Sequence, residues 1–482
     1  MSDVSRALHS SGQEPSNSRA GVPAQRRGTF AALRFRNFKL FWWGQVISVT
    51  GTFMQSTAQQ WLVLTLAPRN PLALGVTGAL QFGPSLLLGP FAGGIIDRYP
   101  RRNILYVTQI AQSILAAVLW LLTLSGLVQI WHVYFLALLL GLFTAIDNPT
   151  RQAFVSEMVP TSHLLNAISL NSVQFNVARI VGPAIAGGLI ALLGIPTMFL
   201  LNAISFIAVL IGLRMMRASE LYLTPRRADA THGLRAMSEG VRFIWANYDV
   251  RVTFLLIAIV GTLGFNFNVL LPLLAKDTLH AGPQEFGLLT SALGVGALTG
   301  ALLLARRGGR PTHLILAGTA GLFGLMEALA GQSTSLIVTL VFIALTGVMM
   351  STFSASANTT VQLSSPPEMR GRVMSVYTTI FIGSTPIGNL ATSSIAAAWG
   401  VPLSFAFTGL PCVLAAGLAT WLWRREKVTR RGARATVVDG AEVAFSATAQ
   451  TRFSTGVIPE SVGGASGIHH APHPSDADQV DD

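Results

Sequence analysis

The amino-acid sequence predicts an all-α integral membrane protein whose twelve transmembrane helices form two similar bundles of six. Only 11% of its 482 residues are charged, whereas an ordinary soluble domain carries about 25%. Its apolar residues lie in long runs, and about 20 residues are enough to cross a bilayer as a helix. In addition, Gly51-Thr52 recurs as Gly261-Thr262, and the pair Asn148 and Gln152 recurs as Asn358 and Gln362. Such internal duplication is typical of secondary transporters.

The predicted spans are the twelve long apolar segments, six in each half. They begin near Leu40, Leu72, Ile104, Trp131, Leu164, Thr197, Val252, Phe286, Leu314, Leu336, Val373 and Val401. The chain therefore divides into an N-terminal tail, a bundle, a linker, a second bundle and a C-terminal tail, at residues 1–38, 39–216, 217–248, 249–424 and 425–482. The linker contains a stretch compatible with a short surface helix, Leu234 to Trp245, and the polar C-terminal tail is predicted to be disordered.

The placement of the basic residues explains the net charge of +12. Of the 33 Lys and Arg residues, all but Arg69, Lys276 and Arg179 fall on one side of the predicted spans. Basic residues concentrate on the cytoplasmic side of membrane proteins, so both termini are predicted to be cytoplasmic. The charge indicates orientation in a lipid bilayer and no nucleic-acid partner. The first span is predicted to be an uncleaved anchor, because no cleavable signal peptide precedes it.

Enzyme and metal signatures are missing from the sequence. A phosphate-binding P-loop requires Gly-Lys followed by Ser or Thr, whereas Lys39, Lys276 and Lys427 precede other residues. The His-Glu-x-x-His and Gly-x-Ser-x-Gly patterns are also absent, and the single cysteine, Cys412, lies in an apolar run. We therefore expect no enzymatic activity, no cofactor and no metal site.

The first loop on the predicted cytoplasmic side carries a family resemblance. Its residues Gly93 to Arg102 resemble the loop between helices 2 and 3 of the major facilitator superfamily, with Pro100 in place of the second glycine. A carboxylate and guanidinium groups at this face can pair across the two halves or cap a helix end, and so close the cytoplasmic side. The alternative is that the arginines only set orientation. The predicted cytoplasmic gate comprises Asp97, Arg98, Arg101, Arg102 and Arg151.

The resemblance covers residues 34 to 424. Within the superfamily, the chain resembles the branch that includes enterobactin exporters and macrolide-efflux proteins. The residues that carry it are Arg36-Asn37-Phe38, Trp61-Leu62-Val63, Asp147-Asn148-Pro149, Asn166-Ala167 and Ala178 to Pro183. It implies a protein with the major facilitator fold, which is located in the bacterial inner membrane. It also implies export of a small molecule by alternating access, driven by the proton gradient and without a cofactor. We expect a monomer.

The fifth predicted span has two unusual features. Its small residues allow close helix packing, and Gly182-Pro183 with Gly187 is similar to the antiporter signature of drug exporters, one residue longer than usual. A packing role and a coupling role both remain open. Arg179 lies in the same span, and a charge at this depth normally faces the bundle interior or a wet cavity. The alternative for Arg179 is a structural pair. Its candidate partners are Glu327 and unpaired backbone carbonyls near the Pro183 break.

Four amide side chains are candidate substrate ligands, in addition to Arg179. They are Gln55 and Gln59 in the first span, and Asn266 and Asn268 in the seventh. Neutral amides beside aromatic residues suit a large, partly polar organic ligand, and the alternative is hydrogen bonding between helices. Relatives often carry an acid after the glycine where this chain has Gly51-Thr52, so proton coupling is expected to use Glu327 or Asp147.

These features together predict a secondary transporter of a hydrophobic or amphipathic, drug-like organic compound. The resemblance implies that it exports this compound and that it does so by proton antiport. A dedicated siderophore exporter is an alternative with the same architecture. A membrane sensor that transports nothing is an alternative of another class.

Overall fold

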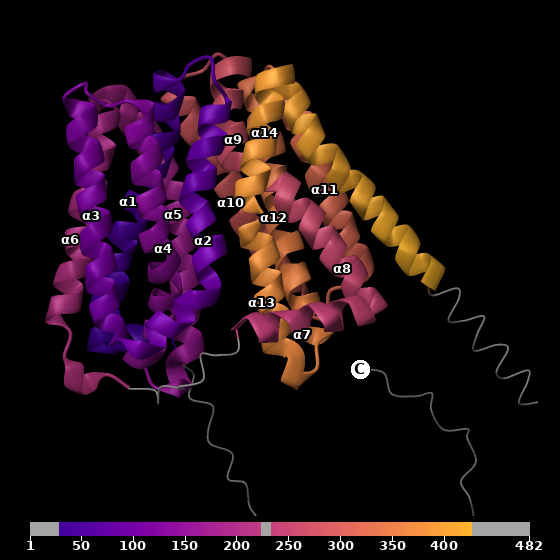
Figure 1. Ribbon diagram of the computed structural model, residues 1–482, viewed down its shortest axis with the longest axis horizontal. Helices are drawn as coiled ribbons and strands as arrows, with labels where there is room; N and C mark the ends of the chain where they lie inside the picture. Colours follow the sequence, from indigo (N-terminus) through magenta and orange to yellow (C-terminus); the bar gives the residue numbers. More distant parts are fainter. Residues whose placement is uncertain (1–27, 223–232, 427–482) are drawn as a thin grey trace, which may run out of the picture. The chain divides into compact units, whose positions relative to one another are not determined.

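The computed structural model describes residues 28–222 and 233–426, which are almost entirely helical and contain no strand (Figure 1). Most of the two predicted tails and part of the linker, residues 1–27, 427–482 and 223–232, lie outside the described residues. The predicted disorder of the C-terminal tail therefore concerns residues that are not described. Helices are the expected form of this chain, because they satisfy backbone N–H and C=O groups where no water is available.

The first half consists of six long helices that pack on one another. They are α1 (Arg36–Leu66), α2 (Leu72–Arg98), α3 (Arg101–Leu124), α4 (Ile130–Met158), α5 (Leu164–Leu193) and α6 (Ile195–Met215). Helix α1 packs against α5 and α6, α3 against α4 and α6, and α2 against α4. Gly194, at φ 81°, separates α5 from α6, because glycine adopts a positive φ without strain. Pro100 stands directly before α3.

The second half repeats this helical pattern with two interrupted spans. It contains α8 (Tyr248–Ile259), α9 (Phe267–Leu273), α10 (Pro283–Arg307), α11 (His313–Gln332), α12 (Leu336–Leu363), α13 (Pro367–Gly383), α14 (Thr385–Trp399) and a last helix, Val401–Glu426. The π-helical segments Val260–Gly264 and Leu274–Thr278 flank α9. Helix α12 packs against α10 and α11.

Nine helical segments of the described residues are long and apolar enough to cross a membrane. They comprise α3, α4, α5, α6, the Tyr248–Thr278 segment, α10, α11, α12 and the last helix. Of the twelve predicted spans, α1, α2 and the α13–α14 segment fall outside this set. Helix α2 contains a shorter apolar stretch, Leu72–Leu88. The number twelve remains a prediction, while the all-helical membrane fold is shown.

The break between α8 and α9 is stabilised by a side chain. The Asn266 Nδ2 atom donates to the carbonyl oxygens of Thr262 and Leu263, both at 2.8 Å. Helix α14 crosses this break closely, since a Cβ atom at Gly388 would collide with the Thr262 carbonyl oxygen. Such irregular backbone is tolerated at membrane depth only where protein surrounds it, and Asn266 is fully buried.

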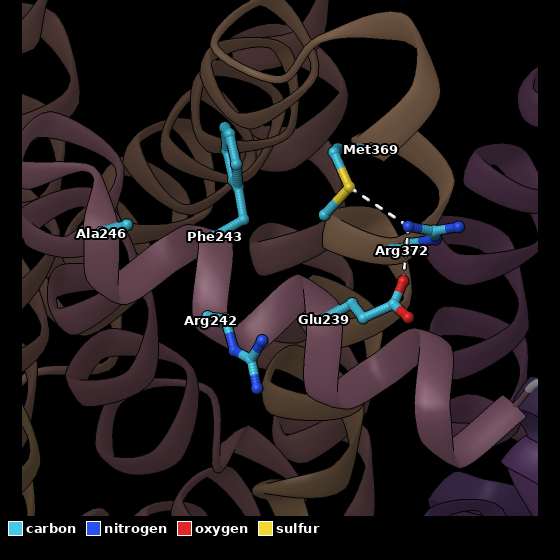
Figure 2. A pocket seen from close by; sticks show the side chains of 6 residues that line it. All are labelled: Glu239, Arg242, Phe243, Ala246, Met369 and Arg372. Carbon is cyan, nitrogen blue, oxygen red and sulfur yellow. Dashed lines mark hydrogen bonds and ion pairs between the residues drawn. The ribbon is translucent and has the colours of Figure 1, made fainter.

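Helix α7 (Gly233–Ala246) precedes the second half and packs against α13. The pocket between them has a volume of about 390 Å³ (Figure 2). A carboxylate oxygen of Glu239 lies 2.5 Å from a guanidinium nitrogen of Arg372, which also approaches the sulfur of Met369. Helix α7 therefore links the connection between the halves to the start of α13.

Close packing of α10 on α12 requires a glycine, and this generates a prediction about stability. A Cβ atom at Gly296 would collide with the carbonyl oxygen of Ala344. We expect Gly296→Ala to lower the free energy of unfolding by about 1–3 kcal/mol, the usual cost of overpacking. Thermal unfolding of the purified protein measures this effect.

Gly318 provides the matched control, because a Cβ atom there meets nothing within 4 Å. Replacing glycine by alanine inside a helix normally stabilises it, by up to about 1 kcal/mol. Equal unfolding temperatures for Gly296→Ala and Gly318→Ala would contradict the packing described here.

Candidate functional site

The candidate functional site is the seam along which the two halves meet. Helix α5 packs against α10, α2 against α14, and α1 against α9. We call the end of the bundle where α1 ends and α2 begins the Arg69 end, and the opposite end, where α2 ends, the Asp97 end. The sequence predicts that the Arg69 end faces the periplasm and the Asp97 end the cytoplasm. Helix α2 also packs against α13, where a Cβ atom at Gly383 would collide with Leu86.

The crossing of α5 and α10 depends on glycines. A Cβ atom at Gly287 would lie 2.5 Å from the Pro183 carbonyl oxygen and 2.9 Å from the Gly187 Cα atom. Gly182 faces the first half instead, where its Cβ position lies 2.7 Å from the Cβ atom of Phe53. The candidate packing residues of α5, which are Gly182, Pro183 and Gly187, thus lie against α1 on one side and α10 on the other. Small residues allow helix backbones to approach closely in membranes.

Helix α1 and the α9 segment are joined by polar contacts at the Arg69 end. The Gln60 Nε2 atom donates to Asn268 Oδ1 at 3.2 Å. The Lys276 ammonium group donates to the carbonyl oxygen of Leu64 at 2.6 Å. Leu64 lies in the last turn of α1, where backbone carbonyls lack partners within the helix and attract a cation. Lys276 therefore connects the second half to the end of α1.

Helices α2 and α14 meet through small and polar residues. A Cβ atom at Gly75 would collide with the Ser393 hydroxyl, and one at Gly78 with the Asn389 amide. The side-chain nitrogen and oxygen of Asn389 are buried without a hydrogen-bond partner among the described residues. This seam therefore contains unused hydrogen-bonding capacity.

The predicted substrate ligands lie in different surroundings. Gln55 accepts a hydrogen bond from Asn202 at 2.8 Å, inside the first half. Gln59 donates to Gln81 at 3.4 Å, so it also lies within that half. Asn266 stabilises the α8–α9 break, and its Oδ1 atom is buried without a partner among the described residues. Asn268 is the one among these four amides that contacts the other half.

Arg179 is half-buried in α5 near this seam. Its guanidinium group donates to Asn176 Oδ1 at 3.1 Å, while its Nε atom is buried with no partner among the described residues. Arg179 therefore forms its hydrogen bond within its own helix. It does not bond to Glu327, the partner proposed from the sequence.

The two candidate proton carriers, Asp147 and Glu327, differ in how many hydrogen bonds and ion pairs stabilise the charged carboxylate. Asp147 is buried and accepts hydrogen bonds from Thr108 at 2.6 Å, from Gln109 at 2.9 Å and from the Arg151 guanidinium. Glu327 is also buried but accepts one, from Thr408 at 3.0 Å. A buried carboxylate is stable when it is ion-paired and hydrogen-bonded. The surroundings of Asp147 meet this condition, and those of Glu327 do not.

The arginines at the Asp97 end have partners within the first half. Arg101 lies 2.9 Å from Glu157, and Arg102 donates to the Leu213 carbonyl oxygen at 2.5 Å, near the end of α6. Arg151 donates to Gln45 Oε1 at 2.5 Å as well as to Asp147. Arg98 lies over the ring of the adjacent Tyr99, 5.9 Å from its centroid. Asp97 is half-buried and makes no hydrogen bond or ion pair within residues 28–222 and 233–426.

The sequence alone did not indicate a functional role for Lys276, Asn389 or Thr408. Lys276 did carry a signal, since it is one of two basic residues on the predicted periplasmic side. Asn389 and Thr408 carried none, because single Asn and Thr residues are common in membrane helices and their importance depends on what they face.

The fold and this seam define a membrane transporter of the major facilitator class. A model of the transmembrane secretion effector family matches residues 27–446. The chain therefore belongs to this family of major facilitator transporters, and it is not an enzyme.

Three curated relatives illustrate the range of the family. The chain is 28% identical to a staphyloferrin A transporter of Staphylococcus aureus over 386 residues, which are 78% of this chain and 93% of the relative. It is 23% identical to macrolide efflux protein A of Streptococcus pyogenes, over 78% of this chain and 94% of the relative. It is 28% identical to multidrug efflux pump Tap of Mycolicibacterium fortuitum, over 78% and 92%.

Solved structures share the fold at low sequence identity. A bacterial homologue of the lysosomal transporter Spinster, in an inward-facing, occupied conformation, matches with a TM-score of 0.64 and 15% identity, over 81% of this chain and 97% of that one. An inward-facing bacterial homologue of ferroportin matches with a TM-score of 0.60 and 19% identity, over 81% and 98%.

The Lys276 contact generates a prediction about the seam. We expect Lys276→Gln to loosen the Arg69 end, because a charge-assisted hydrogen bond between the halves is lost. A net loss of about 1 kcal/mol corresponds to an about fivefold change in the ratio of conformations. Spin labels at Arg69 and His280, followed by distance measurement, should show a larger population of long distances.

Lys39→Gln is the control for this experiment. Lys39 is an exposed lysine near the Asp97 end, and its side chain makes no bond to the second half within the described residues. A distance distribution in Lys276→Gln that matches both the wild type and Lys39→Gln would contradict a role of Lys276 in holding the seam.

Proposed function

We propose that this protein exports a hydrophobic or amphipathic organic compound across the bacterial plasma membrane by proton antiport. The observation that carries the proposal is the family match over residues 27–446, together with relatives named for macrolide and multidrug efflux. Because the family consists of transporters, the sensor alternative is not proposed further. The protein would act as a monomer with both termini in the cytoplasm.

The seam supports alternating access as the mechanism. If the Arg69 end faces the periplasm, the contacts of Lys276 and Gln60 hold the periplasmic side closed in this conformation. The gate arginines meanwhile have their partners inside the first half. In the proposed alternative conformation, the two halves rock, the Arg69 end separates, and Asp97 with Arg98, Arg101, Arg102 and Arg151 stabilises closure of the Asp97 end.

The five proposed substrate ligands keep hydrogen-bonding capacity for a ligand. Gln55 and Gln59 each use one end of the amide in the contacts already described, and so does Asn268. Asn266 Oδ1 and Arg179 Nε are buried without a partner among the described residues. Such a set can bind a partly polar molecule through several hydrogen bonds while apolar residues cover its remainder.

A dedicated siderophore exporter is the second candidate. The observation that favours it is the 28% identity to a staphyloferrin A transporter, over 93% of that relative. Siderophores carry several polar groups, so the amides and Arg179 would then contribute more to recognition than the surrounding apolar residues.

Accumulation of labelled compounds in efflux-deficient cells tests these proposals. We expect cells that express the protein to accumulate less of at least one compound from a panel of macrolides, lipophilic dyes and siderophores. An uncoupler should restore accumulation, because it collapses the proton gradient. Lower accumulation that persists with the uncoupler would contradict proton coupling. Higher accumulation with the protein present would contradict export.

The isolation of Asp97 generates a separate prediction. We expect Asp97→Asn to abolish transport while leaving the unfolding temperature of the purified protein unchanged, since Asp97 makes no hydrogen bond or ion pair with the described residues in this conformation. Transport and thermal unfolding are measured on the same variant.

Glu220→Gln is the control for Asp97→Asn. Glu220 forms an exposed ion pair with Arg217 at 2.9 Å, and exposed pairs contribute little to stability. This variant should transport normally. Normal transport by Asp97→Asn would contradict the proposed gate.

A further inference from the structure

Glu327 is a fully buried carboxyl group with no cation beside it in the described part of the chain. It lies on α11 and faces the last helix, where Thr408 donates a hydrogen bond to its Oε1 atom at 3.0 Å. Its Oε2 atom is buried and has no partner among the described residues. Leaving a charged group in this state is costly, because neither water nor an opposite charge compensates it.

Within residues 28–222 and 233–426, the helices packed around Glu327 supply one titratable neighbour. Helix α12 and the segment Val260–Gly264, which both contact α11, contain no acidic, basic, cysteine or tyrosine residue. The last helix contributes Cys412, whose thiol donates to the Thr408 carbonyl oxygen at 3.2 Å. The charged residues of the last helix begin at Arg424, and His313 begins α11, each about 20 Å or more along its helix from this site.

The Thr408 hydroxyl has three acceptors within reach and one hydrogen to donate. Glu327 Oε1 lies at 3.0 Å, and the carbonyl oxygens of Ser404 and Phe405 both lie at 3.1 Å. A hydroxyl group donates one hydrogen and accepts through two lone pairs. Thr408 can therefore donate to an ionised Glu327. It can equally accept a hydrogen bond from a protonated Glu327 while donating to its own helix. Both protonation states fit without moving a helix.

A strip of buried polar groups connects this pair to the seam between the halves. The Ser404 hydroxyl, one turn from Thr408, donates to the Thr392 carbonyl oxygen of α14 at 2.8 Å. The Thr392 hydroxyl and both polar atoms of the Asn389 side chain are buried without partners among the described residues. Asn389 lies against Gly78 of α2, in the other half. Buried polar groups of this kind normally bind internal water.

We propose that Glu327 and Thr408 form a proton-binding site that exchanges with water at the α2–α14 seam through the strip Ser404, Thr392 and Asn389. A proton that reaches this water from bulk solvent as hydronium passes to the carboxylate, which becomes a carboxylic acid and leaves a neutral water behind, while the Thr408 hydroxyl turns from Glu327 to its own helix. Release reverses both changes. The proposal deepens the proposed proton antiport, because it assigns proton binding to Glu327 and leaves Asp147 as an ion-paired structural group.

Infrared difference spectroscopy of the purified full-length protein tests this site without any transported compound. The wild type minus Glu327→Gln spectrum at neutral pH should contain the carbonyl-stretch band of a protonated carboxylic acid. Thr408→Val should shift this band, because it removes the hydroxyl that accepts the hydrogen bond. Thr408→Ser keeps the hydroxyl and should restore the band position.

Thr346→Val is the matched control, since Thr346 is a fully buried threonine that donates to its own helix, at the Phe342 carbonyl oxygen. It should leave the band in place. A difference spectrum that contains only ionised carboxylate bands overturns the site, and so does a Thr408→Val band at the wild-type position. If Glu327→Gln does not fold, the two Thr408 variants still decide the question.

The route is tested by the rate at which this band shifts after transfer to heavy water. Thr392→Val should slow the exchange severalfold relative to the wild type and Thr346→Val, because it interrupts the strip. An unchanged rate overturns the route while leaving the proton site intact. Because neither measurement depends on transport, a failure here is distinguishable from a failure of the proposed export function.

Discussion

The structure depends on one constraint, which is that a hydrocarbon medium offers no hydrogen-bond partners. The backbone responds by forming helices, in which each span satisfies its own N–H and C=O groups. Side chains follow the same rule, and many hydroxyl groups, such as those of Thr77 and Thr346, donate to a carbonyl four residues earlier in their own helix. The buried groups that depart from this rule therefore stand out. Glu327 and Asn389 are the clearest of them among the described residues.

Glycines determine where helices can approach one another closely. At the crossing of α5 and α10, Gly187 and Gly287 bring the backbones of the two halves together. Within the second half, Gly296 does the same for α10 and α12. Side chains also meet across this interface, where Trp61 stacks on Phe286 and the Ser291 hydroxyl donates to the Ile180 carbonyl oxygen at 2.7 Å. The proposed rocking of the halves would have to separate these contacts, while the packing within each half stays intact.

The two ends of the bundle are organised differently. At the Arg69 end, Lys276 and Gln60 bond across the halves. At the Asp97 end, the gate arginines bond within the first half, and Arg372 of the second half pairs with Glu239 of α7. The charges at the Asp97 end are thus held in place without joining the halves. In the proposed mechanism, these charged groups stabilise closure of the Asp97 end when the Arg69 end separates.

Local sequence determined the class of this protein, because hydropathy and charge placement act within a single span. Long apolar runs predicted the helices, and the motif from Gly93 to Arg102 predicted the family. Tertiary structure decided which polar residues meet, such as Lys276 with the end of α1 and Glu327 with Thr408. Such partners lie far apart in the chain, and the rotation and crossing of their helices bring them together. Asp147 and Glu327 are both acids in apolar segments, and only the packing around them distinguishes a compensated carboxylate from an uncompensated one.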